Sequence, residues 1–271
     1  MNCRTHRISN SRIYPPLSVN IFSFLARTAA GAVYTLPNIA KLYVHQRIAG
    51  SDVFYSYAKR WAVAILRITR TELSVEYSDG AADASRPAIY VCNHLSLLDA
   101  PALIAALPGN VRILYKQEIK KMPFFGGMLA RSPFIAVNRG DTREAAASFY
   151  QAVREISDGG SVLLFPEGTW SSDGNLLPFK RGALLMALRS GKPVVPVAIW
   201  GTQDALPADA YRFRGGKARV LVGTPVEIPE APTKEDERNL AARIRTALED
   251  LLFTLKTGAA SESVSPVASG E

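Results

Sequence analysis

Short apolar runs that alternate with helical patterns constrain the fold of this chain more than any other feature of its sequence. The run 88–92 (AIYVC) is apolar at every position, as expected of a strand buried on both faces of a sheet. A helical pattern at 142–157 has apolar residues every three or four positions, and a Gly-Gly pair follows it. Strands that alternate with helices predict a single α/β domain with a mainly parallel sheet flanked by helices.

The same patterns assign most of the chain to defined elements. Thr233 and Asp236 resemble the capping box that opens a long helix. Residues 1–16 and the small, polar residues 258–271 are predicted to be disordered, which leaves 71–257 as the folded domain. Strands are expected at 71–77, 88–92, 111–115, 134–137, 161–165, 194–199, 218–222 and 225–228, and helices at 20–47, 52–68, 96–107, 142–157, 182–190 and 234–256.

Residues 17–70 are predicted to form an amphipathic two-helix segment that contacts a membrane surface. Aromatic and aliphatic side chains are interleaved there with basic residues such as Arg27 and Lys41, which suits the lipid–water boundary. Charged residues and Pro37 interrupt the apolar stretch, so a membrane-spanning helix is not expected. The alternative is a pair of ordinary helices that pack on the domain.

The overall composition narrows the classes of partner. The 271 residues carry a formal net charge of +8 with a pI of about 9.6, which favours anionic partners such as lipid head groups. No RNP, zinc or helix-turn-helix pattern is present, so no nucleic-acid partner is expected. His6, His45 and His94 lack metal-ligand spacing, so no metal site is expected. A disulfide between Cys3 and Cys92 is not expected, which suits a reducing compartment.

A histidine and a carboxylate lie five residues apart, directly after the apolar run 88–92. In Asn93-His94-x4-Asp99, the imidazole can exchange a proton near neutral pH, and the carboxylate can fix its tautomer. No Ser-x-x-His or Cys/His nucleophile pairing is evident in the sequence. The pair is therefore interpreted as a base that activates a hydroxyl group of a substrate. The alternative is helix capping by Ser96 and Asp99 without any chemistry.

Three further blocks follow at predicted strand ends, where α/β sheets gather their functional groups. In 134–139 (FIAVNR), Arg139 is a candidate phosphate ligand or else a surface residue in a turn. In 165–171 (FPEGTWS), the Gly-Thr turn offers backbone N–H groups to a polar ligand, or else Glu167 is a structural hydrogen-bond acceptor. In 194–199 (VVPVAI), the internal proline predicts an edge or bulged strand beside a cavity, while the valines are expected to pack in the core.

The four blocks, in this order and spacing, resemble the glycerolipid acyltransferase family, which includes bacterial 1-acyl-sn-glycerol-3-phosphate acyltransferases. The likeness extends over about residues 70–230. It implies that 71–257 is an acyltransferase domain that moves a fatty acyl group from acyl-CoA or acyl-carrier protein to the hydroxyl of a lysophospholipid. The expected product from 1-acylglycerol-3-phosphate is phosphatidic acid. The family needs no metal or cofactor and is membrane-associated. We therefore expect an anionic membrane surface as a partner, at the cytoplasmic face of the inner membrane, with peripheral or monotopic attachment.

The resemblance also implies roles for individual residues. His94 is similar to the general base of the family and Asp99 to its partner. The block around Arg139 corresponds to the acceptor side, and the block with Pro196 is associated with the acyl donor. The substrate-binding residues expected from these matches are Asn93, Ser96, Lys116, Phe134, Ile135, Arg139, Glu167, Gly168, Thr169, Trp170, Lys180, Arg181 and Pro196.

One residue departs from the family pattern. Trp170 stands where the family usually has arginine, and an indole cannot make the bidentate phosphate contact of a guanidinium. Lys116, Arg139, Lys180 or Arg181 is a candidate to supply the missing charge. Otherwise the acceptor is expected to be another lysolipid without a phosphate monoester. A catalytically silent lipid-binding protein on the same fold is the further alternative.

Overall fold

The structure is a computed structural model that describes residues 21–49, 52–78, 80–81, 86–121, 125–138, 142–157, 160–207, 213–258 and 264–266. The predicted disordered segment 1–16 and the candidate phosphate ligand Arg139 lie outside these ranges.

Within the described residues, eight strands form one sheet in the order β4-β3-β5-β2-β6-β7-β1-β8. Neighbours from β4 through to β6 run parallel, as do β7 and β1, whereas the β6–β7 and β1–β8 pairs are antiparallel. The predicted mainly parallel sheet is therefore confirmed. The strands are β1 (Thr71–Tyr77), β2 (Ile89–Cys92), β3 (Val111–Lys116), β4 (Ile135–Val137), β5 (Ser161–Leu164), β6 (Val194–Trp200), β7 (Gly216–Val222) and β8 (Val264–Pro266).

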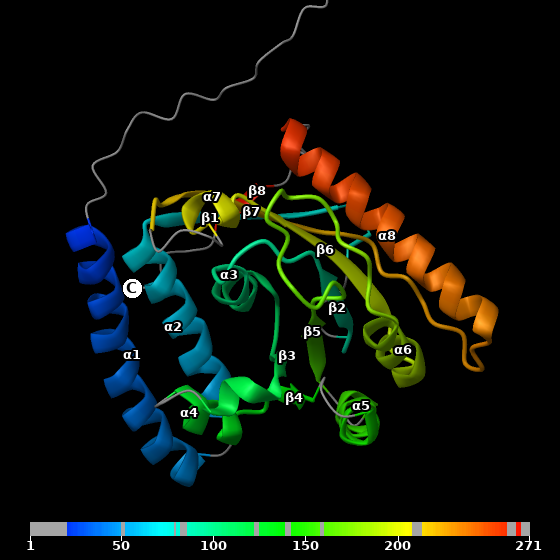
Figure 1. Ribbon diagram of the computed structural model, residues 1–271, viewed down its shortest axis with the longest axis horizontal. Helices are drawn as coiled ribbons and strands as arrows, with labels where there is room; N and C mark the ends of the chain where they lie inside the picture. The colour runs from blue at the N-terminus through cyan, green and yellow to red at the C-terminus, as the bar shows by residue number, and fades with distance from the viewer. Residues whose placement is uncertain are drawn as a thin grey trace, which may run out of the picture.

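Helices cover both faces of the sheet and give the domain three layers (Figure 1). On one face α3 packs near the sheet, α2 packs on α3, and α1 packs on α2 at the outer edge. On the other face lie α5, α6 and α8, with α8 packed along β6. The helices are α1 (Ile21–Ala49), α2 (Asp52–Thr69), α3 (Asp99–Ala106), α4 (Phe125–Arg131), α5 (Thr142–Ser157), α6 (Arg181–Ser190), α7 (Thr202–Ala205) and α8 (Lys234–Thr257), with a short 3₁₀ helix η1 (Gln117–Lys121).

The central strand β2 shows why the apolar runs specify this architecture. Tyr90 and Cys92 pack into the core beneath α3, while Ile89 and Val91 pack into the core beneath α5, α6 and α8. All four side chains are buried. Because successive residues of a strand point to opposite faces, a continuous apolar run fits a sheet that is covered on both sides.

The C-terminal part of the chain differs from the prediction in two places. Residues 225–228 do not form a strand, because only Val226 pairs, in a single antiparallel bridge with Val194. The tail 258–271 was expected to be wholly disordered, but Val264–Pro266 pairs with β1 as the edge strand β8. The long helix α8 begins as predicted, with Thr233 and Asp236 in a reciprocal capping box.

Of the two positions predicted for Pro196, an edge strand or a bulge, the edge strand was wrong. β6 is an interior strand between β2 and β7. Its pairing with β7 begins at Val197, and the Pro196 carbonyl accepts from the Gly223 N–H at 2.8 Å, just beyond the end of that ladder. The strand therefore accommodates a residue without an N–H where the antiparallel pairing stops.

The α1–α2 pair joins the domain mainly through apolar packing. Its inner side chains include Ile39, Leu42 and Phe54, which are buried. On the outside, Phe22 and Val33 of α1 expose 76% and 72% of their surface. In the part of the chain that the structure describes, no helix combines the length and hydrophobicity needed to cross a bilayer.

Candidate active site

His94 and Asp99 meet at the carboxyl end of β2, in the turn that leads into α3. The His94 Nδ1 lies 2.7 Å from the Asp99 Oδ2, and the Asp99 side chain is fully buried while that of His94 is 18% exposed. A carboxylate only accepts hydrogen bonds, so Nδ1 carries the proton. None of the described residues hydrogen-bonds to Nε2, which therefore offers its lone pair to a substrate.

Asp99 is held by four donors, not by the histidine alone. Its Oδ2 also accepts from the backbone N–H groups of Leu95 and Ser96, at 2.6 and 2.9 Å. Its Oδ1 accepts from the Thr202 hydroxyl at 2.5 Å. This turn explains why α3 begins at Asp99 and not at Ser96 as predicted, since residues 95 and 96 direct their N–H groups to the carboxylate. Asp99 thus contacts the histidine, as predicted, but it binds N–H groups that precede the helix, and the N-terminus of α3 has no side-chain cap.

Two further side chains fix the turn that carries His94. Asn93 bonds through its amide to both the N–H and the carbonyl of Ile199, at 2.8 and 3.0 Å, which extends the β2–β6 pairing. Glu167 accepts from the His94 N–H at 3.0 Å and from the Leu177 N–H at 2.8 Å. Burial raises the pKa of Glu167 from its usual range. Both of its oxygens bind backbone groups, so the structural reading of Glu167 fits the geometry better than contact with a substrate.

Aromatic rings line the imidazole. Phe165 stacks on His94 with 4.1 Å between ring centroids, and Trp170 meets it edge to face at 6.1 Å. The Ser171 N–H donates to the His94 carbonyl at 2.8 Å, which ties the Trp170 loop to the histidine. Trp170 is 40% exposed and stands beside the imidazole of His94. The residue that departs from the family pattern is thus a direct neighbour of the candidate base.

Cys92 is adjacent in sequence but unsuited to act as a nucleophile. Its side chain is fully buried in the core beneath α3. Burial, reinforced by the nearby carboxylates of Asp99 and Glu167, raises the pKa of the thiol well above its usual range. The prediction that Cys92 packs in the core is confirmed.

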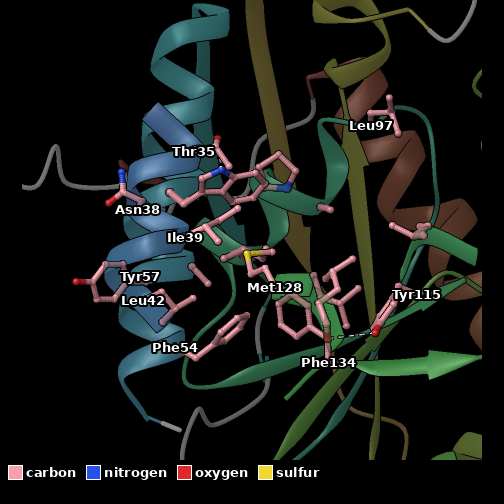
Figure 2. A pocket seen from close by; sticks show the side chains of 18 residues that line it. Thr35, Asn38, Ile39, Leu42, Phe54, Tyr57, Leu97, Tyr115, Met128 and Phe134 are labelled. Carbon is pink, nitrogen blue, oxygen red and sulfur yellow. Dashed lines mark hydrogen bonds between the residues drawn. The ribbon is translucent and has the colours of Figure 1, made fainter. Parts of the chain in front are cut away.

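An apolar cavity of about 270 Å³ lies between the α1–α2 pair and the domain (Figure 2). Leu97, three residues after His94, is on its lining, as is Phe134 of the second block. Phe54 of α2 contacts Phe134 edge to face at 5.1 Å. Figure 2 shows side chains from α1, including Ile39, gathered around the same space as Met128 and Phe134. We call this space the apolar cavity.

A second cavity, of about 530 Å³, lies at the carboxyl ends of β4 and β5. Its lining includes Phe165, which stacks on His94, together with Gly168, Lys180 and Asn138. Lys180 is exposed and precedes α6, whose first-turn residues Gly182 and Ala183 also line this cavity. We call this space the strand-end cavity. Arg139, the next residue after Asn138, lies outside the described residues.

The remaining predicted residues do not all meet at His94. Ile135 is buried in β4 and Pro196 in β6, while Thr169 is exposed beside Trp170. Ser96 is buried and donates to the Leu206 carbonyl at 2.7 Å. Two of the four basic residues considered as substitutes for the missing arginine have acidic partners. Lys116 lies 3.5 Å from Glu118, and Arg181 pairs with Glu237 of α8 at 2.5 Å.

Thr202 is the residue of this site that the sequence analysis missed. It follows β6 in a short helix with no periodic signal, and its contact with Asp99 spans 103 positions of sequence. The sequence did offer one signal for this residue. Gly201-Thr202 follows an apolar strand, and a glycine at that position indicates a tight turn. Among the described residues, no group of three or more His, Cys, Asp or Glu side chains is placed to hold a metal ion.

Comparisons with known proteins show similarity to acyltransferases. The acyltransferase family profile matches residues 72–200. A chloroplastic 1-acyl-sn-glycerol-3-phosphate acyltransferase of Brassica napus is 31% identical over 66% of this chain and 52% of its own length. The alpha enzyme of the same name from Homo sapiens is 32% identical over 64% of this chain and 61% of its own length. The chain thus spans about half to three fifths of these two relatives.

A solved structure supports the fold. The crystal structure of the 1-acyl-sn-glycerophosphate (LPA) acyltransferase from Thermotoga maritima superposes with a TM-score of 0.73 at 23% identity. The match covers 86% of this chain and 95% of that protein. The matched range 72–200 includes His94, Asp99 and the third and fourth sequence blocks. Residues 72–200 therefore carry an acyltransferase domain, and the chain is similar to 1-acyl-sn-glycerol-3-phosphate acyltransferases.

Proposed function

We propose that this protein is an O-acyltransferase that moves a fatty acyl group from a thioester to the free hydroxyl of a lysophospholipid. The proposed acceptor is 1-acylglycerol-3-phosphate, which yields phosphatidic acid, and the donor is acyl-CoA or acyl-carrier protein. The observation that carries the proposal is the His94–Asp99 pair, in which Asp99 binds Nδ1 and leaves Nε2 available as a base. The names of the curated relatives support the same reaction.

The reaction needs one base and no covalent enzyme intermediate. His94 Nε2 takes the proton of the acceptor hydroxyl as its oxygen attacks the thioester carbonyl. The tetrahedral intermediate then collapses with cleavage of the C–S bond, and the leaving thiolate takes the proton back from His94. Asp99 stabilises the imidazolium while it exists. The inaccessible Cys92 thiol supports direct transfer over an acyl-enzyme.

The two cavities suit the hydrocarbon end and the phosphate end of a lysophospholipid. The apolar cavity is lined by side chains such as Leu97, Ile104 and Phe134, and suits a hydrocarbon chain. The strand-end cavity has Lys180 and the α6 N-terminus beside it, which suits a phosphate group. Arg139 is proposed as a further ligand of this phosphate, because its sequence block resembles the acceptor side of the family. The acyltransferase domain is assigned to 71–257.

Membrane contact through α1 and α2 is part of the proposal. The outer surface of α1 exposes Phe22, Leu25, Val33 and Leu36 beside the exposed cation Lys41. Apolar side chains next to basic ones match an anionic lipid surface. The apolar cavity opens between this pair and the domain, so a lipid substrate would reach it from the bilayer. Peripheral or monotopic attachment is supported by these exposed side chains, and its place at the cytoplasmic face of the inner membrane is proposed from the resemblance in sequence.

The decisive experiment follows a radiolabelled acyl group from acyl-CoA and from acyl-carrier protein to a panel of lysolipids. We expect transfer to 1-acylglycerol-3-phosphate and a loss of roughly 100- to 10,000-fold in His94→Ala. Thermal unfolding and circular dichroism of the variant control for folding. If the wild type releases no thiol with any acceptor, the protein is a silent lipid-binding member of the fold. If folded His94→Ala retains full turnover, the base is misassigned.

Trp170 supports a second candidate acceptor. The indole beside His94 carries no charge, and Arg181 is engaged by Glu237, so the phosphate site has fewer cations than the family pattern implies. A lysolipid without a phosphate monoester would suit such a site. The acceptor panel repeated with Trp170→Arg separates the two candidates. A selective gain on 1-acylglycerol-3-phosphate favours the second acceptor, and equal strong use of it by both proteins favours the first.

A further inference from the structure

We propose that Thr202 is a positioning residue for the reaction, which holds the Asp99 carboxylate in the orientation that His94 requires. This inference rests on the proposed role of His94 as the base. The observation behind it is the 2.5 Å hydrogen bond from the Thr202 hydroxyl to Asp99 Oδ1, made between two fully buried side chains. Thr202 thereby joins His94 and Asp99, which the sequence motif presents as a pair of two residues.

Thr202 is the one donor to Asp99, among the described residues, that comes from outside the 94–96 turn. His94, Leu95 and Ser96 all donate to Oδ2, and Thr202 alone among the described residues donates to Oδ1. The bond to Oδ1 adds a second restraint on rotation of the carboxylate about its Cβ–Cγ bond. A carboxylate held at both oxygens presents Oδ2 to the imidazole in one direction.

The chain is shaped to bring the Thr202 hydroxyl to this point. Gly201 has φ +94°, and a Cβ there would lie 2.0 Å from the Lys217 carbonyl oxygen. β6 therefore turns sharply against β7 before Thr202. At the other end of α7, the Leu206 carbonyl accepts from Ser96 at 2.7 Å. The α7 turn is thus fastened to the His94–Asp99 turn at two places, and Thr202 is the one that touches the carboxylate.

The electrostatic surroundings of Asp99 are simple enough for a clear test. The titratable groups that interact with it are His94 on its own turn, Glu167 after β5 and Cys92 at the end of β2. Thr202 adds a neutral hydroxyl that disperses the negative charge of the carboxylate. Its removal leaves a stronger acceptor beside Nδ1, which holds the proton on His94 more tightly.

The test compares Thr202→Val, which keeps the shape and removes the hydroxyl, with Thr202→Ser, which keeps the hydroxyl. We expect Thr202→Val to lower kcat roughly 10- to 100-fold. The acidic limb of its pH–rate profile should move up by about half a pH unit, and Thr202→Ser should restore both. Gln203→Ala is the matched control, because it removes the bond from the Gly201 N–H to the Gln203 Oε1 within the same turn and leaves the threonine in place.

The titration of His94 is also followed by NMR of its imidazole, assigned by difference from His94→Ala. This readout is independent of turnover, so it stays informative if the wild type acylates none of the lysolipids and the proposed function fails. An upward shift in Thr202→Val, absent in Gln203→Ala and reversed in Thr202→Ser, supports the inference. An unmoved titration with equal loss of kcat in Thr202→Val and Gln203→Ala, or kcat within about twofold of wild type in Thr202→Val, overturns it.

Discussion

Hydrogen bonds hold the turn at the end of β2, whereas apolar packing holds the α1–α2 pair against the domain. In the turn, Asn93 and Asp99 are buried polar residues with hydrogen-bond partners at every side-chain oxygen. The helical pair instead meets the domain through the walls of an apolar cavity and exposes large apolar side chains on its outside. Hydrogen bonds are directional, whereas apolar packing is not. The turn therefore holds the His94–Asp99 pair in one geometry, whereas the helical pair bounds an apolar space.

In the turn, the substitution Asp99→Asn has the largest expected effect on kcat. An amide of the same size is uncharged and has one acceptor oxygen, so it cannot accept at both oxygen positions as the carboxylate does. We expect kcat to fall by roughly 1,000- to 10,000-fold, because the imidazolium loses its counter-charge and the Nδ1–H tautomer loses its anionic acceptor. The measurement is acyl transfer from a radiolabelled thioester, with circular dichroism to establish folding. A folded variant that keeps a tenth of the wild-type rate would contradict the geometry.

Phe54→Ala tests the packing side of the comparison. Phe54 is 2% exposed, lines the apolar cavity and contacts Phe134. We expect the free energy of unfolding to fall by about 3–5 kcal/mol and the preferred acyl chain to become longer as the cavity grows. Denaturant unfolding and a donor chain-length series measure the two effects. Phe253→Ala, at a residue that is 67% exposed on α8, is the control and should leave both unchanged.

Glu167→Gln should destabilise the fold less than Phe54→Ala does. It also tests whether Glu167 supports the backbone of the His94 turn or contacts the substrate. A glutamine has one acceptor oxygen, so either the His94 N–H or the Leu177 N–H loses its partner. We expect a loss of about 1–3 kcal/mol in the free energy of unfolding. The exposed Glu230→Gln serves as the matched control. If Glu167→Gln raises the KM for the acceptor while the stability stays at the wild-type value, Glu167 contacts substrate and the supporting role is wrong.

The double variant Phe22→Gln with Leu25→Gln should leave the fold almost untouched. These side chains expose 76% and 57% of their surface, so we expect a change in unfolding free energy within about 0.5 kcal/mol. Binding to vesicles of anionic lipid should weaken at least about 10-fold, because burial of each side chain stabilises the bound state. Sedimentation with vesicles measures it. Unaltered vesicle binding would show that another surface meets the membrane.

The two regions also differ in how far the sequence predicted them. The apolar run of β2 and the capping box at Thr233 act locally, so their elements were predicted closely. His94 and Asp99 are near neighbours in sequence, and their contact was predicted too. Thr202 was missed because its bond to Asp99 depends on how β6 packs beside β2. The position of Pro196 was misjudged for the same reason, since strand order is a property of the whole sheet.

The central claim is that Asp99 holds the proton of His94 on Nδ1 and leaves Nε2 as the base. Nitrogen-15 NMR of the imidazole in the intact protein, at a pH above its titration midpoint, measures this directly. The account predicts a protonated Nδ1 and a bare Nε2 in the wild type, with that preference lost in Asp99→Asn. A proton found on Nε2 of the wild-type His94 would contradict it.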